Sequence, residues 1–190
     1  MFNDDDLELN SNQTYFNLVI GTTGTGKTTF CKETIKDYLS EYDNDYKVVV
    51  IDPQGTFPIH PNKRIIKPKI DIRKDQIGGK NTWDYLDSIY NSLIVIDDTR
   101  IIFQDWGGKD IYQLGINRRH HNNDLIMIFH SLNAVQRLVY TVVNYVYLFR
   151  INENWDTIRN KVPSQITEKI FDRANKLEKF QKLELEIVAP

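Results

Sequence analysis

Short apolar runs alternate with amphipathic stretches along most of this chain. The apolar run from Tyr15 to Ile20 is followed by residues 27–41, where apolar side chains recur at helical spacing. Nearly continuous apolar runs, which are typical of parallel strands buried on both faces, follow at 47–51, 93–96, 125–129 and 142–149. Helical patterns cover 82–90, 110–121, 132–140 and 165–177, and a last strand is predicted over 183–188. The alternation predicts an α/β fold with a mainly parallel central sheet covered by helices on both faces.

The N-terminus and one internal segment depart from this pattern. Residues 1–13 are acidic and polar, and we expect a tail there, followed by a single domain over 14–190. Within the domain, residues 53–80 are expected to form a basic insertion. Polar and apolar residues alternate from Lys69 to Arg73, which is typical of a small exposed strand or hairpin. Residues 157–190 are expected to add a C-terminal helix and strand.

Composition narrows the class of protein. The chain has 190 residues, of which 41% are hydrophobic and 26% charged, which excludes a wholly disordered chain. A net charge of −2 argues against a passive nucleic-acid coat protein, so any DNA contact must come from local basic patches. The single cysteine, Cys31, excludes a disulfide scaffold and a CxxC zinc site. The apolar stretch 138–149 is too short for a membrane span, and the acidic start shows no secretory leader. We expect a protein that is not secreted.

The strongest motif is a phosphate-binding loop between the first strand and the first helix. The sequence fits G-x-x-x-x-G-K-[ST] in full, and this motif cradles nucleotide phosphates with backbone N–H groups and a helix N-terminus. Lys27 is expected to reach the β- and γ-phosphates of ATP, and the Thr28 hydroxyl to ligate Mg²⁺. The predicted nucleotide-binding residues are Gly21, Thr22, Thr23, Gly24, Thr25, Gly26, Lys27, Thr28 and Thr29.

A second acidic site follows the strand at 93–96. Asp97 is predicted to anchor Mg²⁺, directly or through water, and Asp98 to orient the attacking water. The alternative is that these two carboxylates only cap the next helix. Asp52 ends the preceding buried strand and is a further candidate acid, although Pro53 after it also fits a plain turn.

These motifs together resemble the HerA–FtsK superfamily of P-loop motor ATPases, in particular its viral genome-packaging branch. The resemblance covers roughly residues 15–150 and includes Asp52-Pro53, the paired aspartates and the segment from Arg119-His120 to His130. It implies a RecA/ASCE-like three-layer P-loop NTPase sandwich. In that family the strand after the arginine segment usually ends in a glutamine that senses the γ-phosphate; His130 takes this place here.

The resemblance also implies partners. Family members act as rings, generally hexamers, that move double-stranded DNA, and a viral member works in the host-cell cytoplasm or at the packaging vertex of the virion, where it docks a capsid or portal-vertex protein. In such a ring an arginine of the neighbouring subunit can stabilise the charge on the γ-phosphate. Arg118 and Arg119 are the candidates for this finger, with Arg150 in reserve. The alternative is that 118–121 is a solvated basic turn.

Two segments are candidates for DNA contact. One is the run of basic residues Lys63, Arg64, Lys67, Lys69, Arg73 and Lys74, since backbone charge dominates non-specific duplex affinity. The other is Trp106-Gly107-Gly108-Lys109, which follows the acidic pair. Ordinary solvated surface is the alternative for both.

The leading hypothesis is therefore an ATP-driven DNA translocase of the viral packaging type. The alternatives are a filamentous-phage-type assembly ATPase, a small P-loop kinase and a nucleotide-gated scaffold protein. A kinase would leave the paired acids without an obvious purpose, and a scaffold would hydrolyse ATP weakly.

Overall fold

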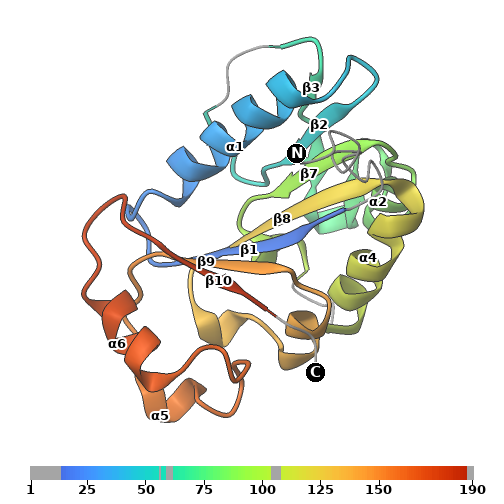
Figure 1. Ribbon diagram of the computed structural model, residues 1–190. Coiled ribbons are helices and arrows are strands. Elements are labelled where there is room, and N and C mark those ends of the chain that lie inside the picture. Colours follow the sequence, from blue (N-terminus) through green and yellow to red (C-terminus); the bar gives the residue numbers. More distant parts are fainter. Residues whose placement is uncertain (1–13, 56, 59–61, 104–107, 188–190) are drawn as a thin grey trace, which may run out of the picture.

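A seven-stranded sheet forms the centre of the molecule (Figure 1). The computed structural model describes residues 14–55, 57–58, 62–103 and 108–187, so the predicted acidic tail lies outside the described residues. The strand order is β10-β9-β1-β8-β7-β2-β3. The strands are β1 (Phe16–Ile20), β2 (Lys47–Ile51), β3 (Ile65–Ile66), β7 (Ser92–Ile96), β8 (Asn123–Phe129), β9 (Tyr145–Leu148) and β10 (Leu183–Glu186). The pairing is parallel throughout except for β10 on β9, which is antiparallel.

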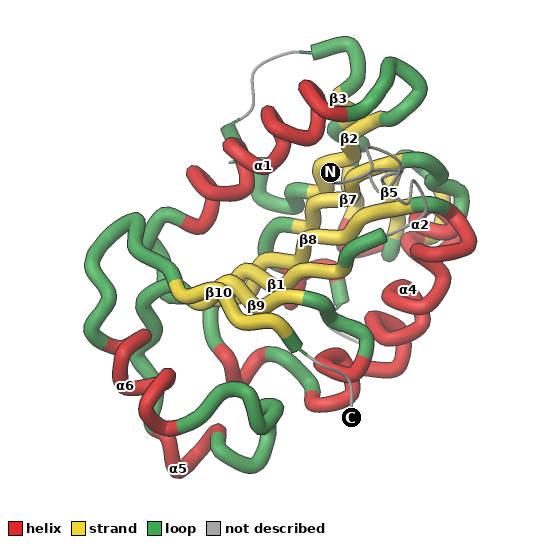
Figure 2. The backbone as a smooth tube through the Cα atoms, in the orientation of Figure 1, coloured by secondary structure: helices red, strands yellow, loops and turns green. Residues whose placement is uncertain are grey.

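Helices lie on both faces of this sheet, so the predicted three-layer α/β fold is confirmed (Figures 1 and 2). The α-helices are α1 (Lys27–Glu41), α2 (Thr82–Asp87), α3 (Thr99–Ile102), α4 (Gly108–His121), α5 (Trp155–Ile158) and α6 (Glu168–Asn175). The two-residue period of a strand explains the layering. In β1, Val19 packs in the cluster on the α1 face, whereas Leu18 and Ile20 join the larger cluster on the α4 face. Each central strand is therefore apolar on both sides.

The basic insertion is more folded than the predicted hairpin. It contains a three-stranded antiparallel sheet of β4 (Ile70–Asp71), β5 (Gln76–Ile77) and β6 (Lys80–Asn81). The alternating pattern ends at Ile72, where the 3-10 helix η2 (Ile72–Lys74) turns the chain. Ile77 is fully buried in the main core, so this sheet is anchored to the domain by its middle strand.

Two predicted elements before β9 differ in the structure. The single helix expected at 132–140 is two 3-10 helices, η3 (Leu132–Ala134) and η4 (Arg137–Thr141). The strand expected from Val142 begins at Tyr145, because η4 occupies the chain up to its C-cap at Val142. The side chain of Asn144 accepts a hydrogen bond from the backbone N–H of Phe16 at 2.8 Å. Among the described residues, no helix is long and apolar enough to cross a membrane.

Candidate nucleotide site

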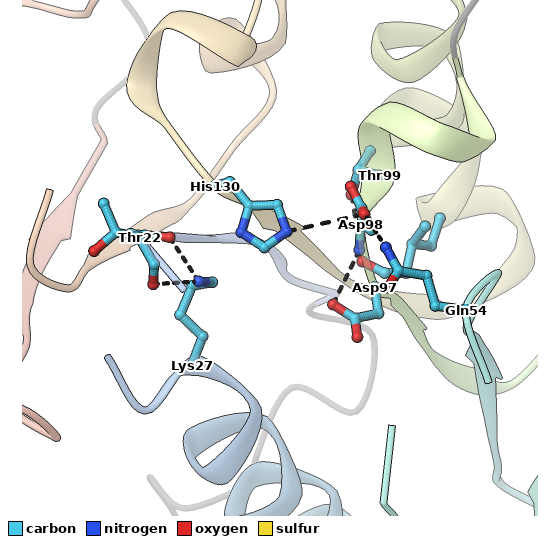
Figure 3. Close-up of polar contacts among 9 residues, drawn as sticks. Thr22, Lys27, Gln54, Asp97, Asp98, Thr99 and His130 are labelled. Atoms are coloured by element: carbon cyan, nitrogen blue, oxygen red, sulfur yellow. Dashed lines mark hydrogen bonds and ion pairs between the residues drawn. The ribbon is translucent and has the colours of Figure 1, made fainter. Parts of the chain in front are cut away.

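One cavity at the carboxyl edge of the sheet gathers the main predicted site residues. Because β1, β7 and β8 are parallel neighbours, the phosphate loop, the acidic pair and His130 all follow strands at the same edge (Figure 3). The cavity measures about 460 Å³ and is lined by Thr23, Gly24, Gly26, Lys27, Thr28, Thr29, Gln54, Asp97, Asp98, His130, Lys179 and Phe180. The carboxylates and the glycine loop, distant in sequence, therefore face a common space.

The phosphate loop has the backbone that its glycines predict. Gly24 and Gly26 adopt φ values of 79° and 108°, in the left-handed region where other residues are strained. Gly26 precedes the 15-residue helix α1, so the N-terminal N–H groups of this helix open on the cavity. The ammonium of Lys27 is buried and donates to the carbonyl oxygens of Gly21 at 2.6 Å and Thr22 at 2.8 Å. Burial lowers the pKa of Lys27.

Some predicted loop residues hold the loop rather than line the cavity. The Thr25 hydroxyl donates to the Thr22 carbonyl at 2.8 Å, and Thr22 Oγ1 donates to the carbonyl of Arg150 at 3.1 Å. The Thr22 N–H bonds the same Arg150 oxygen at 2.8 Å. These contacts tie the loop to the end of β9.

The two aspartates have different surroundings. Asp97 is half-buried, its Oδ1 accepts a hydrogen bond from the N–H of Asp98 at 3.0 Å, and burial raises its pKa. Asp98 has a φ of 47°, and its Oδ2 accepts a hydrogen bond from Gln54 Nε2 at 2.8 Å. Asp98 occupies the N-cap position of α3, but its side chain makes no capping hydrogen bond. The helix-capping alternative therefore has no support at Asp98.

The residues suit a magnesium ion held jointly with phosphate. The Thr28 hydroxyl and the Asp97 carboxylate are hard oxygen donors on one cavity, and Mg²⁺ is usually bound by one or two such side chains together with substrate phosphates and water. Among the described residues, no group of three or more His, Cys, Asp or Glu side chains is placed to hold a metal by itself. The donor set thus fits magnesium that arrives with a nucleotide.

Asp52 does not join the site, contrary to one expectation. Its Oδ2 accepts hydrogen bonds from the N–H of Phe57 at 2.6 Å and from Lys67 Nζ at 3.3 Å. It is buried and does not line the cavity, so it holds the start of the insertion in place.

Sequence reasoning missed other residues that line the cavity. Gln54 lies two residues after Asp52, and its side chain contacts Asp98. Lys179 and Phe180 come from the C-terminal segment, for which no motif was visible. A polar residue just after a strand-ending Asp-Pro was an available signal for Gln54, whereas only folding brings residues 179–180 to the loop.

The structure separates the candidate arginines. Arg118 is 2% exposed, and its guanidinium donates to the carbonyl of Gly115 and, at 2.9 Å, to Asn144 Oδ1. This burial is incompatible with the expected role of Arg118 as a finger, because the group cannot reach another subunit. Arg119 is exposed near the end of α4, at the edge of the sheet opposite the cavity. Arg150 is exposed at the carboxyl edge, beside the phosphate loop.

The basic run in the insertion is partly occupied by internal contacts. Arg64 donates to the carbonyls of Leu39, Tyr42 and Tyr46 and so closes the C-terminal end of α1, and Lys67 pairs with Asp52. Lys63, Lys69, Arg73 and Lys74 are exposed. In the second candidate segment Lys109 is exposed, whereas Trp106 and Gly107 lie outside the described residues.

Solved structures with the same fold include viral packaging enzymes. The DNA-packaging ATPase B204 from Sulfolobus turreted icosahedral virus aligns with a TM-score of 0.65 and 14% identity, covering 93% of this chain and 94% of that one. The genome packaging NTPase B204 from Sulfolobus turreted icosahedral virus 2, in complex with ATP-gammaS, aligns with a TM-score of 0.67, 13% identity and 94% coverage of both chains. The N-terminal domain of zonular occludens toxin from Neisseria meningitidis aligns with a TM-score of 0.51 and 15% identity, over 84% of this chain and 97% of that one.

Sequence comparison assigns the family. A search among curated protein sequences gave no match. The family model described as the central domain of helicase HerA matches residues 7–188, nearly the whole chain. The chain therefore belongs to the HerA family of P-loop ATPases, as the sequence predicted.

Proposed function

We propose that this protein is an ATP-driven motor that moves double-stranded DNA during viral genome packaging, as a homo-oligomeric ring at the packaging vertex in the infected cell. The observation that carries the proposal is that the phosphate loop, Asp97, Asp98 and His130 line one cavity. Similarity in fold to viral packaging ATPases supports double-stranded DNA as the molecule that the motor moves.

The side chains around the cavity have different roles in ATP hydrolysis. Lys27 and the first N–H groups of α1 bind the triphosphate. Thr28 and Asp97 would hold magnesium, which would supply positive charge to offset that of the phosphates. Asp98 orients the attacking water, because the hydrogen bond from Gln54 fixes one oxygen of the Asp98 carboxylate. His130 lies near the same carboxylate and contacts the γ-phosphate or the water. The Asp98 carboxylate also accepts the proton that this water loses.

A neighbouring subunit completes the site in this proposal. Arg119 lies at the far edge of its own sheet, so it serves the cavity of another subunit rather than its own. Arg150, beside the loop, is the alternative finger. DNA is contacted through exposed cations of the insertion and Lys109, and binding is salt-sensitive and tolerant of sequence because such contacts go to phosphates.

The decisive experiment measures phosphate release with magnesium and ATP, with and without duplex DNA. A motor is stimulated by duplex DNA of unrelated sequences, and stimulation falls as salt rises. A requirement for a small-molecule phosphate acceptor would identify a kinase instead. Turnover that stays weak under all conditions would identify a nucleotide-gated scaffold or assembly protein.

The ring is tested by mixing inactive variants. Lys27→Ala subunits bind the triphosphate weakly and turn it over very slowly but retain Arg119, whereas Arg119→Ala subunits retain the loop. Mixing them restores part of the activity if Arg119 acts across an interface. The same mixture is made with Arg150→Ala subunits in place of Arg119→Ala subunits. Rescue with Arg150→Ala but not with Arg119→Ala would assign the finger role to Arg150. The particle mass with a non-hydrolysable ATP analogue and duplex DNA gives the number of subunits.

A further inference from the structure

The segment between α6 and β10 lies directly against the phosphate loop (Figure 1). The backbone N–H of Phe180 donates to the carbonyl of Thr25 at 2.8 Å. A Cβ atom on Gly26 would lie 2.6 Å from Phe180 Cδ1, so the aromatic ring touches the loop where only glycine leaves room. Residues near the C-terminal end of the chain thus form part of the wall of the nucleotide cavity.

A second cavity continues from the first on the side away from the acidic pair. It measures about 430 Å³ and is lined by Gly26, Thr29, Phe30, Glu33, Phe149, Phe180 and Lys182. Gly26, Thr29 and Phe180 belong to both cavities. The two spaces therefore meet at the start of α1 and at the Phe180 ring.

The positions of Asp97 and Asp98 indicate how a bound nucleotide is oriented in the cavity. Asp97 and Asp98 act on the γ-phosphate end, so the rest of the nucleotide extends away from them. Thr29 lies beyond Thr28 on α1 and lines the shared boundary. The ribose and base then reach the second cavity.

Phe180 has the features of a binding residue rather than a core residue. Its side chain is 59% exposed, although it contacts Gly26, and its φ is 69°. A bulky residue in the left-handed region is an outlier that costs energy and is held only by its surroundings. Lys179 Nζ lies 4.9 Å from the centre of this ring, and the part of the ring that stays exposed offers a surface on which any nucleobase can stack.

The polar groups beside this ring suit the edge of a base. Lys182 Nζ lies 4.9 Å from the ring centre of Phe30 and 4.8 Å from that of Tyr147. It also lies 3.4 Å from Glu184 Oε2, so two aromatic faces and a carboxylate hold its ammonium. Glu33 projects from α1 into the same cavity. One donor and one acceptor thus stand at the rim, as in pockets that read a planar heterocycle.

We propose that Phe180 is the stacking platform for the nucleobase, with Glu33 and Lys182 at its edge and Lys179 beside its ring. The proposal rests on the proposed binding of a nucleoside triphosphate at residues 21–29 and adds the subsite that holds the base. It makes the C-terminal segment part of nucleotide recognition.

The test compares a ligand with a base and a ligand without one. Affinities for a non-hydrolysable ATP analogue and for inorganic tripolyphosphate, both with magnesium, are measured by calorimetry for the wild type and Phe180→Leu. Loss of the stack weakens the ATP analogue at least about fivefold and leaves tripolyphosphate within about twofold. Tyr90→Ala, which removes an exposed aromatic ring before β7, is the matched control and changes neither affinity.

Other outcomes overturn the proposal in distinguishable ways. Equal affinities of Phe180→Leu and wild type for the ATP analogue would refute the stacking role of Phe180 but leave the proposed function intact. An equal loss for both ligands would show that Phe180 only shapes the phosphate loop. Failure of the wild type to bind either ligand would overturn the proposed function together with the platform.

A tryptophan variant controls for the possibility that Phe180→Leu acts by distorting the phosphate loop. Phe180→Trp retains a stacking surface, so its affinity for the ATP analogue stays at or above that of the wild type. Its fluorescence changes when the ATP analogue binds and stays constant with tripolyphosphate. The same fluorescence change with both ligands would contradict stacking.

Discussion

The side chains of Asp98 and His130 meet across the mouth of the nucleotide cavity. They follow the adjacent parallel strands β7 and β8, and Asp98 Oδ2 lies 3.9 Å from His130 Nε2 (Figure 3). The same oxygen accepts a hydrogen bond from Gln54, so an imidazole and an amide flank one carboxylate. This arrangement holds the carboxylate in a defined orientation while 49% of the imidazole remains exposed to the cavity and solvent.

Lys27→Ala is expected to lower ATP turnover by about 100-fold or more, because the buried ammonium lies in the phosphate loop and is expected to neutralise charge on the β- and γ-phosphates. Nucleotide affinity falls as well, which calorimetry measures. Lys36→Ala removes an exposed lysine from the same helix and serves as the control. Unchanged hydrolysis in Lys27→Ala would refute the assigned site.

Asp98→Asn is expected to stop hydrolysis while ATP affinity stays within about threefold of the wild type. Asparagine has nearly the same shape and tolerates a positive φ, so the fold is retained and only the charge that activates water is lost. Single-turnover phosphate release and equilibrium binding separate the two effects. Equal losses of binding and turnover would contradict a water-positioning role.

His130→Gln is expected to keep most of the ATPase activity, whereas His130→Ala loses about tenfold or more. Glutamine retains a hydrogen-bond donor near Asp98 and is the residue that the family resemblance implies at this place. Alanine removes the side chain after β8 that is proposed to contact the γ-phosphate or the water. Comparable rates for the alanine variant and the wild type would exclude His130 from the mechanism.

Arg118→Ala is expected to reduce the free energy of unfolding by about 2 kcal/mol or more. The substitution removes two hydrogen bonds and the contact of the guanidinium with the Phe16 ring, 6.0 Å from its centre. Denaturant unfolding measures the change. Arg119→Ala, on the exposed neighbour, stays within about 0.5 kcal/mol, and equal destabilisation of the two variants would contradict the buried role of Arg118.

Asp124 is expected to make stability depend on pH. Burial raises the pKa of its carboxyl to about 6. The hydrogen bond from the N–H of Tyr15 and the positive charge of Arg118 oppose this rise. The folded state then holds a proton that the unfolded state releases near pH 4, so stability falls as pH rises from about 4 to about 6 and levels off above. Urea unfolding of the wild type shows this fall, and Asp124→Asn lacks it. Parallel pH profiles would contradict the assignment.

Local sequence determined the central framework. The runs at 47–51 and 27–41 have the same bounds in the structure as in the prediction, because a buried parallel strand and an amphipathic helix each carry their signal within a few residues. The mixed segment at 132–140 was predicted less well, since two short 3-10 helices leave no sustained period.

The sequence by itself determined the phosphate loop and the acidic pair, because both chemistries need fixed residue types at short spacing. The tertiary structure alone decided which distant residues share the site. Gln54 meets Asp98, Phe180 covers Gly26, and Arg118 turns inward. Such contacts depend on strand order and on packing between elements far apart in the chain, and a local pattern of residues gives at most a hint of them, as the polar residue after Asp52-Pro53 does for Gln54.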